Sequence, residues 1–382
     1  MRTRVVIGRN GTDNSCRNES WSALLRCAMT LVEGHASSTA GNTTEAWRRG
    51  TAGRGGSNLW RSLIATTRKA TASHADLKPV ATSLSARMRA SLLGYWQQSR
   101  PPQRFAAVVG AGLIVVGLGH LVAWLVVGGA WAGPVSFRKP TTFGISFGLT
   151  TLTLAWVAGQ LRISERTGWL LLVPLAAADT TEVVWVSTQR WRGVASHFNF
   201  DTTLDSSLFL LGGAAIVVAV VVIVVLAVLA FTAMAASPSM ALAIRAGLLL
   251  LLVAQGVGGW MIQHGVGPAS DGVREGLTTF GAAGVMKVPH AVGIHAIQVL
   301  PGLAWLLSFA ALPERRRVGL VGMAVGGYVA LLVVSVLQVA TGVAPLDVGL
   351  VAAALYLLGV ALLGTAFVAA LLALRNPTPP AS

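Results

Sequence analysis

The sequence predicts an all-α protein, a polytopic transmembrane helix bundle of about eight spans behind a disordered N-terminal tail. Three observations predict this fold class. Of the 382 residues, 54% are hydrophobic and only 11% are charged, whereas a soluble domain carries about 25% charged residues. From residue 105 onward, long apolar runs alternate with short polar loops. The residues before that point are rich in Ser, Thr, Ala, Gly and Arg and have no sustained apolar period.

Each predicted span is an apolar run long enough to cross the hydrocarbon core, which takes about 20 residues of helix. Several runs are rich in Val and Ile, which also favour strands. They are too long for the strands of a membrane barrel and lack the alternation of such strands, so we interpret them as helices. The predicted spans are 105–127, 142–161, 168–187, 207–234, 240–262, 289–311, 317–341 and 348–373.

Residues 1–104 are predicted to be a disordered basic cytoplasmic tail, ahead of a transmembrane domain at 105–375 and a short C-terminal tail at 376–382. The tail carries a net charge of +11 out of the total of +15. This favours a solvated segment near anionic lipid over a nucleic-acid arm, so no nucleic-acid partner is expected. Because Met88 opens a short basic lead into the first span, we hypothesise that residues 1–87 come from an over-extended gene start.

Cysteine usage and motif searches exclude several chemistries. Cys16 and Cys27 both lie in the tail, so the membrane domain has no disulfide, thiolate metal site or cysteine nucleophile. It also lacks a phosphate-binding GxxxxGK[ST] loop and an HExxH zinc motif.

Lys and Arg in the loops predict the orientation. The basic tail and the run Arg315, Arg316 and Arg317 lie on one side, which indicates cytoplasmic N- and C-termini in the cell (plasma) membrane. The opposite side also carries cations, so the bias outside the tail is modest.

Three polar segments fall on the predicted outer side, where loops of specific chemistry indicate function. Their cations could form a basic bowl for carboxylate or phosphate, because Arg binds such groups in a bidentate manner and Lys adds a point charge. Ordinary anchoring to lipid phosphates is the alternative. Asp201 and Asp205 could pair with the same cations, which would weaken the ligand interpretation. The candidate residues are Arg138, Lys139, Gln189, Arg190, Arg192, His197, Asn199, Asp201, Lys287 and His290.

Two details concern the histidines of this side. The period-two spacing of His197, Asn199 and Asp201 would place them on one face if their loop is extended. His290 follows Pro289, which suits a first helical turn, so we expect His290 at the mouth of its helix, within reach of His197.

Polar groups also lie inside the predicted spans. Ionisable groups in hydrocarbon cost several kcal/mol unless they are paired or hydrated, so each is a functional candidate. His120, Glu182 and His295 are all predicted about 10 Å below the outer surface, where they could share one pocket. Asp179 lies on the helix face of Glu182, and Gln298 lies on the face of His295.

Three uses remain open for these interior groups. His120 and His295 could be the axial ligands of a b-type haem, or could bind a divalent metal with Glu182. Glu182 and the histidines could instead form a proton or substrate relay. The third use is polar hydrogen bonding between packed helices. The residues favour a protein without a resident cofactor.

A resemblance covers the body of the chain from residue 105. It rests on Phe137-Arg138-Lys139-Pro140, on Arg192-Gly193 with Ser196-His197-Phe198-Asn199, and on His295-Ala296-Ile297-Gln298 through Pro301. With these motifs the sequence resembles an uncharacterised family of multipass bacterial membrane proteins, found chiefly in high-GC, actinobacterial-type bacteria. The resemblance implies the membrane fold and no particular chemistry.

The sequence thus favours a protein of the lipid bilayer that binds, and in one version transports, an anionic small molecule or lipid head group at its outer face. One alternative is a haem- or metal-containing membrane oxidoreductase that uses His120 and His295. Another is a structural membrane protein that acts through partner helices and has no pocket. The residues decide neither an enzymatic activity nor the oligomeric state.

Overall fold

The computed structural model describes residues 83–273 and 275–375. The predictions for residues 1–82 and 376–382, including the two cysteines, lie outside these ranges. Eight of the described helices are long and apolar enough to cross a membrane, which confirms the predicted all-α bundle and its eight spans. They are α4 (Pro101–Val127), α5 (Arg138–Gly159), α6 (Glu165–Arg192), α7 (Thr203–Thr232), α8 (Pro238–Ser270), α9 (Lys287–Leu307), α10 (Glu314–Ala340) and α11 (Leu350–Ala373).

Seven of the eight spans begin two to four residues before the predicted apolar run, and four of them end one to four residues inside it. An apolar run marks the part of a helix that lies in hydrocarbon, and hydrogen bonding continues past it until a cap or turn stops the helix. The largest difference is in α8, which runs on to Ser270 although the apolar run ends at residue 262. At the start of α4, Pro101 occupies the first helical turn, where a missing N–H has no consequence.

A ninth helix, α3 (Leu84–Gln98), lies in the range predicted to be disordered, so that prediction is wrong for these residues. The Ser83 hydroxyl caps the helix by accepting a hydrogen bond from the Ala86 N–H. A helix of this length is marginal alone, and tertiary contacts that no local pattern reveals hold it in place. Since α3 begins at Leu84, a chain that started at Met88 would lack its first turn.

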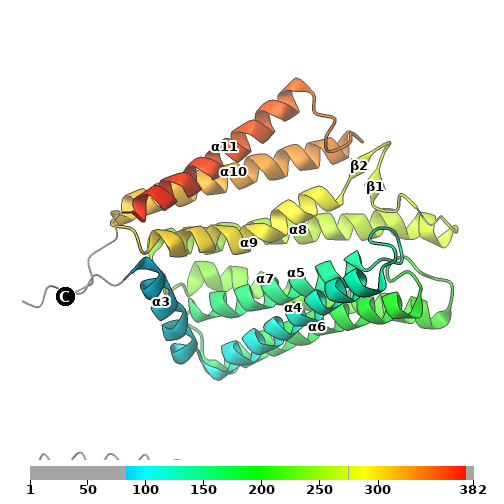
Figure 1. The fold of residues 1–382 in the computed structure, drawn as a ribbon, viewed down its shortest axis with the longest axis horizontal. Coiled ribbons are helices and arrows are strands. Elements are labelled where there is room, and N and C mark those ends of the chain that lie inside the picture. The colour runs from blue at the N-terminus through cyan, green and yellow to red at the C-terminus, as the bar shows by residue number, and fades with distance from the viewer. Residues whose placement is uncertain (1–82, 274, 376–382) are drawn as a thin grey trace, which may run out of the picture. The chain divides into compact units, whose positions relative to one another are not determined.

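Figure 1 shows α3 lying across one end of the bundle, the end at which α4 begins and α11 finishes. We call this the α3 end. The opposite end, which we call the loop end, carries the longer connections 128–137, 193–202, 271–286 and 341–349. A short antiparallel hairpin of β1 (Thr279–Phe280) and β2 (Gly284–Val285) lies in the third of these connections.

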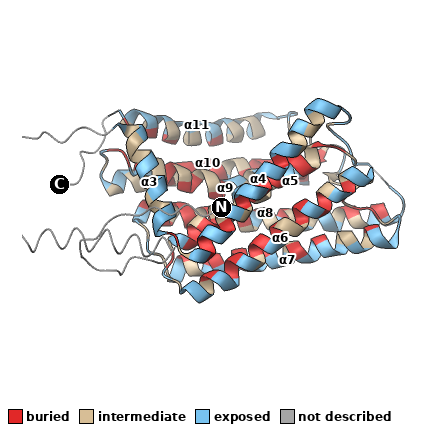
Figure 2. Ribbon diagram, turned by 60° about the horizontal axis from the view of Figure 1, so that its bottom comes forward, coloured by how far each residue is buried: buried red, intermediate tan, exposed pale blue. Residues whose placement is uncertain are grey.

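The spans pack mainly with their chain neighbours, as helix hairpins. Helices α4, α5, α6 and α7 pack against one another, α8 to α11 do the same, and the contacts of α7 with α8 and of α5 with α9 join the two groups. Figure 2 shows buried residues where the helices face one another and exposed residues along the outside. Exposed Val and Leu side chains on α7 and α11 fit an outer surface solvated by lipid tails.

Glycines allow the closest of these contacts. A Cβ at Gly144 on α5 would lie 2.6 Å from the Cα of Gly117 on α4, and a Cβ at Gly148 would lie 2.5 Å from the carbonyl oxygen of Gly110. Small residues spaced by four let two backbones meet, which replaces the hydrophobic driving force that is missing between helices in lipid.

Candidate functional site

One polar network at the loop end joins the last turn of α6 to the first turn of α7. An Arg192 guanidinium nitrogen lies 2.6 Å from Asp205 Oδ1, and the Gln189 side-chain amide donates to the same oxygen at 2.8 Å. The Thr202 hydroxyl donates to Asp205 Oδ2 at 2.7 Å. Asp205 and Gln189 are both buried. Arg192 and Gln189 were predicted to face a ligand, and the structure instead engages both with Asp205.

Arg190 and the neighbouring tryptophan take part in an aromatic stack. The Arg190 guanidinium carbon lies 3.8 Å from the centre of the Phe137 ring, and Trp191 meets the same ring edge-on. The Trp191 indole N–H donates to His120 Nε2 at 3.1 Å, while His120 Nδ1 lies 2.8 Å from the Val116 carbonyl oxygen. These contacts tie α4, α5 and α6 together at the loop end.

The loop after α6 is not extended, so the condition for aligning its polar residues on one face is not met. Phe198 adopts a positive φ of 56° and packs against α8, where a Cβ at Gly265 would lie 2.6 Å from its ring. Asn199 accepts a hydrogen bond from the Asp201 N–H and donates to the Ala195 carbonyl. Asn199 therefore shapes the turn with its own side chain.

The structure does bring together three of the predicted cations. Arg138 and Lys139 open α5, Lys287 opens α9, and the three are close enough for their charges to repel. We call Arg138, Lys139 and Lys287 the cation cluster. No described acidic side chain forms an ion pair with any of them. Neither helix has an acidic residue in its first turn or a side-chain cap, so the positive ends of both helices add to the same charge.

His197 lies beside this cluster. Its ring packs against Trp185 at 4.8 Å and against Phe143 at 5.4 Å between ring centres, and its Nδ1 lies 2.9 Å from the Ser196 hydroxyl. Burial, together with the charges of Lys139 and Lys287, lowers the pKa of His197 to about 3. We therefore treat His197 as a neutral hydrogen-bonding group beside these two lysines.

The three interior residues expected to share one pocket have different surroundings. Both ring nitrogens of His120 are engaged by the contacts described above. Glu182 is buried against α7, where a Cβ at Gly212 would lie 3.0 Å from its Oε1, and His295 is exposed on α9. Among the described residues no group of three His, Cys, Asp or Glu side chains could hold a metal ion. The shared pocket and the haem or metal interpretation therefore stay predictions.

The remaining polar groups of the spans bond within the bundle. His290 Nδ1 lies 2.8 Å from the Ala254 carbonyl oxygen on α8, and the Gln298 amide lies 3.4 Å from the Thr150 hydroxyl on α5. Asp179 is buried, with one carboxyl oxygen 2.5 Å from the Thr151 hydroxyl. These are the hydrogen bonds between packed helices that the sequence left open for such residues.

Sequence reasoning missed a pocket at the α3 end. It has a volume of about 500 Å³ and lies between α3, the end of α5, the start of α8 and the end of α9. Its main residues, such as Tyr95, Trp156 and Trp305, have the composition of an interfacial aromatic belt, which gave no reason to single them out. We call it the α3 pocket.

The eight apolar helices define a multipass integral membrane protein, whose solvent is the lipid bilayer. Comparisons of the chain with protein-family models, with curated proteins and with solved structures give no significant match. The resemblance to a multipass bacterial family stays a prediction, and the function is argued from geometry.

Proposed function

We propose that this membrane protein binds an anionic small molecule or lipid head group at its loop end, on the cation cluster of Arg138, Lys139 and Lys287. The observation that carries the proposal is the contrast between the cations of this end. Arg192 is neutralised by Asp205 and Arg190 lies against Phe137, while the cluster has no acidic partner among the described residues.

The placement of the cluster is electrostatically unfavourable without an anion. A cation near a helix N-terminus opposes the helix dipole by about 0.3–1 kcal/mol, and here three cations gather at two such ends. An anion would relieve both repulsions, and it would also accept hydrogen bonds from the uncapped N–H groups of α5 and α9. The same arrangement of N–H groups and cations binds phosphate and carboxylate in many proteins.

His197 gives the site a group with a different role. Because it is neutral, it neither adds charge nor pairs with the anion as an ion. Its ring can donate or accept one hydrogen bond and so orient a bound head group. Asn199, Asp201, Gln189 and Arg192 hold the loop around it and are supporting residues in this proposal.

The structure favours binding at one face over passage through the bilayer. A transport path for an anion needs polar groups along its length. Between the Gln298–Thr150 contact and the α3 end, the facing segments 151–160 of α5 and 299–307 of α9 contain no Lys, Arg, His, Asp or Glu. We therefore place the site in one leaflet and propose no translocation step.

A binding experiment tests the site. The full chain, purified in an uncharged maltoside detergent at low salt, is titrated with dioctanoyl phosphatidate and separately with inorganic phosphate, and heat is measured. Replacement of both lysines, in Lys139→Gln with Lys287→Gln, should weaken binding at least about tenfold, because two charge-assisted hydrogen bonds are lost. Phosphate binding alone would indicate a soluble anion, and phosphatidate binding alone would indicate a lipid.

The matched control also replaces two cations by Gln, but at the α3 end. Arg315→Gln with Arg316→Gln removes two exposed charges at the α3 end and should leave the affinity within about twofold, since separated exposed charges are screened. Equal affinity in the lysine variant and the wild-type chain would rule out the cation cluster as the site.

We further propose that the α3 end faces the cytoplasm of the cell and the loop end faces outward. Basic residues concentrate at the α3 end, where acidic ones are few, which fits the positive-inside rule. With Cys16 and Cys27 replaced by Ser, single cysteines at Gly133 and at Ser308 can be labelled in intact cells with an impermeant maleimide. Labelling at Ser308 without labelling at Gly133 would reverse the proposed orientation. The basic residues are Arg87, Arg89, Arg100, Arg104, Arg162, Arg166, Arg245, Arg315, Arg316, Arg317 and Arg375.

A further inference from the structure

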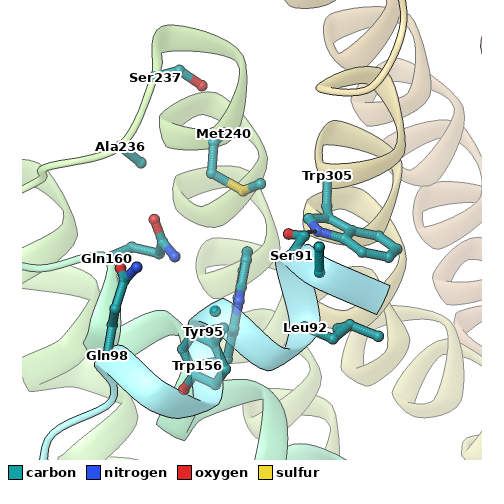
Figure 3. A pocket seen from close by; sticks show the side chains of 12 residues that line it. Ser91, Leu92, Tyr95, Gln98, Trp156, Gln160, Ala236, Ser237, Met240 and Trp305 are labelled. Atoms are coloured by element: carbon teal, nitrogen blue, oxygen red, sulfur yellow. Dashed lines mark hydrogen bonds between the residues drawn. The ribbon is translucent and has the colours of Figure 1, made fainter. Parts of the chain in front are cut away.

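The α3 pocket is a candidate second site, at the end of the bundle opposite the cation cluster. Its volume of about 500 Å³ lies within the range of about 300–1,000 Å³ typical of small-molecule sites. Figure 3 shows the Gln98 and Gln160 amides on one side of the pocket and Trp305 on the other, with Met240 and Ser237 beyond them.

The lining mixes polar and apolar side chains, and none of its residues is Lys, Arg, His, Asp or Glu. Tyr95 Oη is buried beside Gly159 of α5, so it is not exposed to the pocket. No hydrogen bond joins the side-chain amide of Gln98 or Gln160 to another described residue. Trp156 and Trp305 supply aromatic faces beside these groups. The pocket therefore offers unused donors and acceptors next to aromatic surface, without a charge.

Helix α3 forms one wall of this pocket. On one side the Trp305 indole N–H donates to the Ser91 hydroxyl at 3.2 Å. On the other side Tyr95 packs on α5, where a Cβ at Gly159 would lie 3.3 Å from its ring. The outer face of α3 exposes Leu92 and Trp96, at 58% and 45% of their surface. An exposed apolar face on a short helix across the bundle end is typical of an interfacial helix.

Leu92 belongs both to this exposed face and to the pocket lining. The pocket therefore reaches the surface at which lipid head groups and the first methylenes of their chains lie. A ligand that enters there has an apolar tail as well as a polar head, and the lining selects the chemistry of the head.

We propose that the α3 pocket binds the head of an uncharged amphiphile from the adjoining leaflet, a neutral lipid whose hydroxyl and ester carbonyl groups bond to Gln98 and Gln160. Trp156 and Trp305 pack on its glycerol and upper chain carbons. A charged head would lose its hydration in this lining and gain no counter-charge. The proposal does not depend on anion binding at the loop end, because one site selects an anionic head and the other an uncharged head.

Two lipids that differ only in the head distinguish the sites. Dioctanoylglycerol and dioctanoyl phosphatidate have the same chains, and only the first is neutral. Binding of radiolabelled dioctanoylglycerol to the full chain in maltoside micelles is measured by equilibrium dialysis, with either unlabelled lipid as competitor. We expect saturable binding that dioctanoylglycerol displaces at least about tenfold more effectively than phosphatidate does, given the desolvation cost of an unpaired charge.

Gly94 allows a variant that fills the pocket and keeps the fold. It lines the pocket, and a Cβ at this position meets no atom within 4 Å. Gly94→Leu places a side chain in the open volume and also favours the helix, so binding should weaken at least about tenfold while the chain stays folded. The matched control is Gly112→Leu on α4, where a Cβ also meets nothing within 4 Å, and it should bind as the wild-type chain does.

A third variant tests the hydrogen bonds. Gln160→Leu keeps the approximate size and removes the amide, so affinity for dioctanoylglycerol should fall about fivefold, the loss of one hydrogen bond. Lys139→Gln with Lys287→Gln should not change it, whereas that variant loses phosphatidate binding if the loop-end site is correct. Absence of saturable dioctanoylglycerol binding, or binding that Gly94→Leu leaves unchanged, would overturn the α3-pocket proposal alone.

Discussion

Asp205 should stabilise the loop end more than other polar residues there, and replacing it tests the structure directly. Asp205→Ala leaves the buried Gln189 amide with a weaker acceptor, the Ala195 carbonyl at 3.4 Å. It also breaks the ion pair with Arg192 and takes away the acceptor of the Thr202 hydroxyl. Gln189, Arg192 and Thr202 then lose the carboxylate that they share as a hydrogen-bond acceptor.

The expected loss of stability follows from these contacts. A buried hydrogen bond to a charged group is worth about 1.5–3 kcal/mol. The ion pair adds about 0.5 kcal/mol, because the Arg192 side chain is 35% exposed and solvent screens it. Asp205→Ala should therefore lower the free energy of unfolding by about 2–3.5 kcal/mol, and Asp205→Asn, which keeps the shape, should lower it by less.

The assay is unfolding of the full chain in mixed micelles with increasing dodecyl sulfate, followed by tryptophan fluorescence. Asp347→Ala is the matched control, because Asp347 is an exposed carboxylate in another connection of the loop end. A double-mutant cycle with Arg192→Met separates the ion pair from the remaining bonds. If Asp205→Ala costs no more than Asp347→Ala, the network does not hold the fold, and Arg192 and Gln189 become ligand candidates again.

Three further predictions concern single positions. Burial and the lysine charges lower the pKa of His197 to about 3, below its value of about 6.5 in an unfolded chain, so protonation of His197 favours unfolding. The free energy of unfolding should therefore be highest above about pH 6.5 and fall as the pH approaches 3. A steeper loss of stability at acid pH in His197→Gln than in the wild-type chain would contradict this. Gly117→Ala should lower the free energy of unfolding by about 2 kcal/mol, because it forces α4 away from α5. The new Cβ would lie 2.8 Å from the backbone of α5. Gly112→Ala, measured in the same unfolding assay, should leave the free energy of unfolding unchanged. Asp179→Asn can keep the hydrogen bond to the Thr151 hydroxyl and should change the unfolding midpoint little, whereas Asp179→Leu should lower the midpoint. A lower midpoint in Asp179→Asn than in Asp179→Leu would argue for a charged Asp179.

The fold was largely predictable from the sequence, because the bilayer imposes a length on each apolar run. All eight spans appear where runs of about 20 apolar residues occur, and the polar loop end was identified as the more specific side. Helix α3 was not predicted, since it is too short for a membrane span and its stability comes from contacts such as that of Ser91 with Trp305, far away in the chain.

The composition and periodicity of the chain determined that it is a membrane bundle and that its unusual cations share one end. Only the tertiary structure decided which cations stay available: Asp205 pairs with Arg192, Phe137 lies under Arg190, and Lys139 lies near Lys287 without an acidic partner among the described residues. Apolar length is a local property, which the sequence carries directly. Pairing of charges depends on how each helix is rotated and on which helices are neighbours, and packing of the whole bundle sets both.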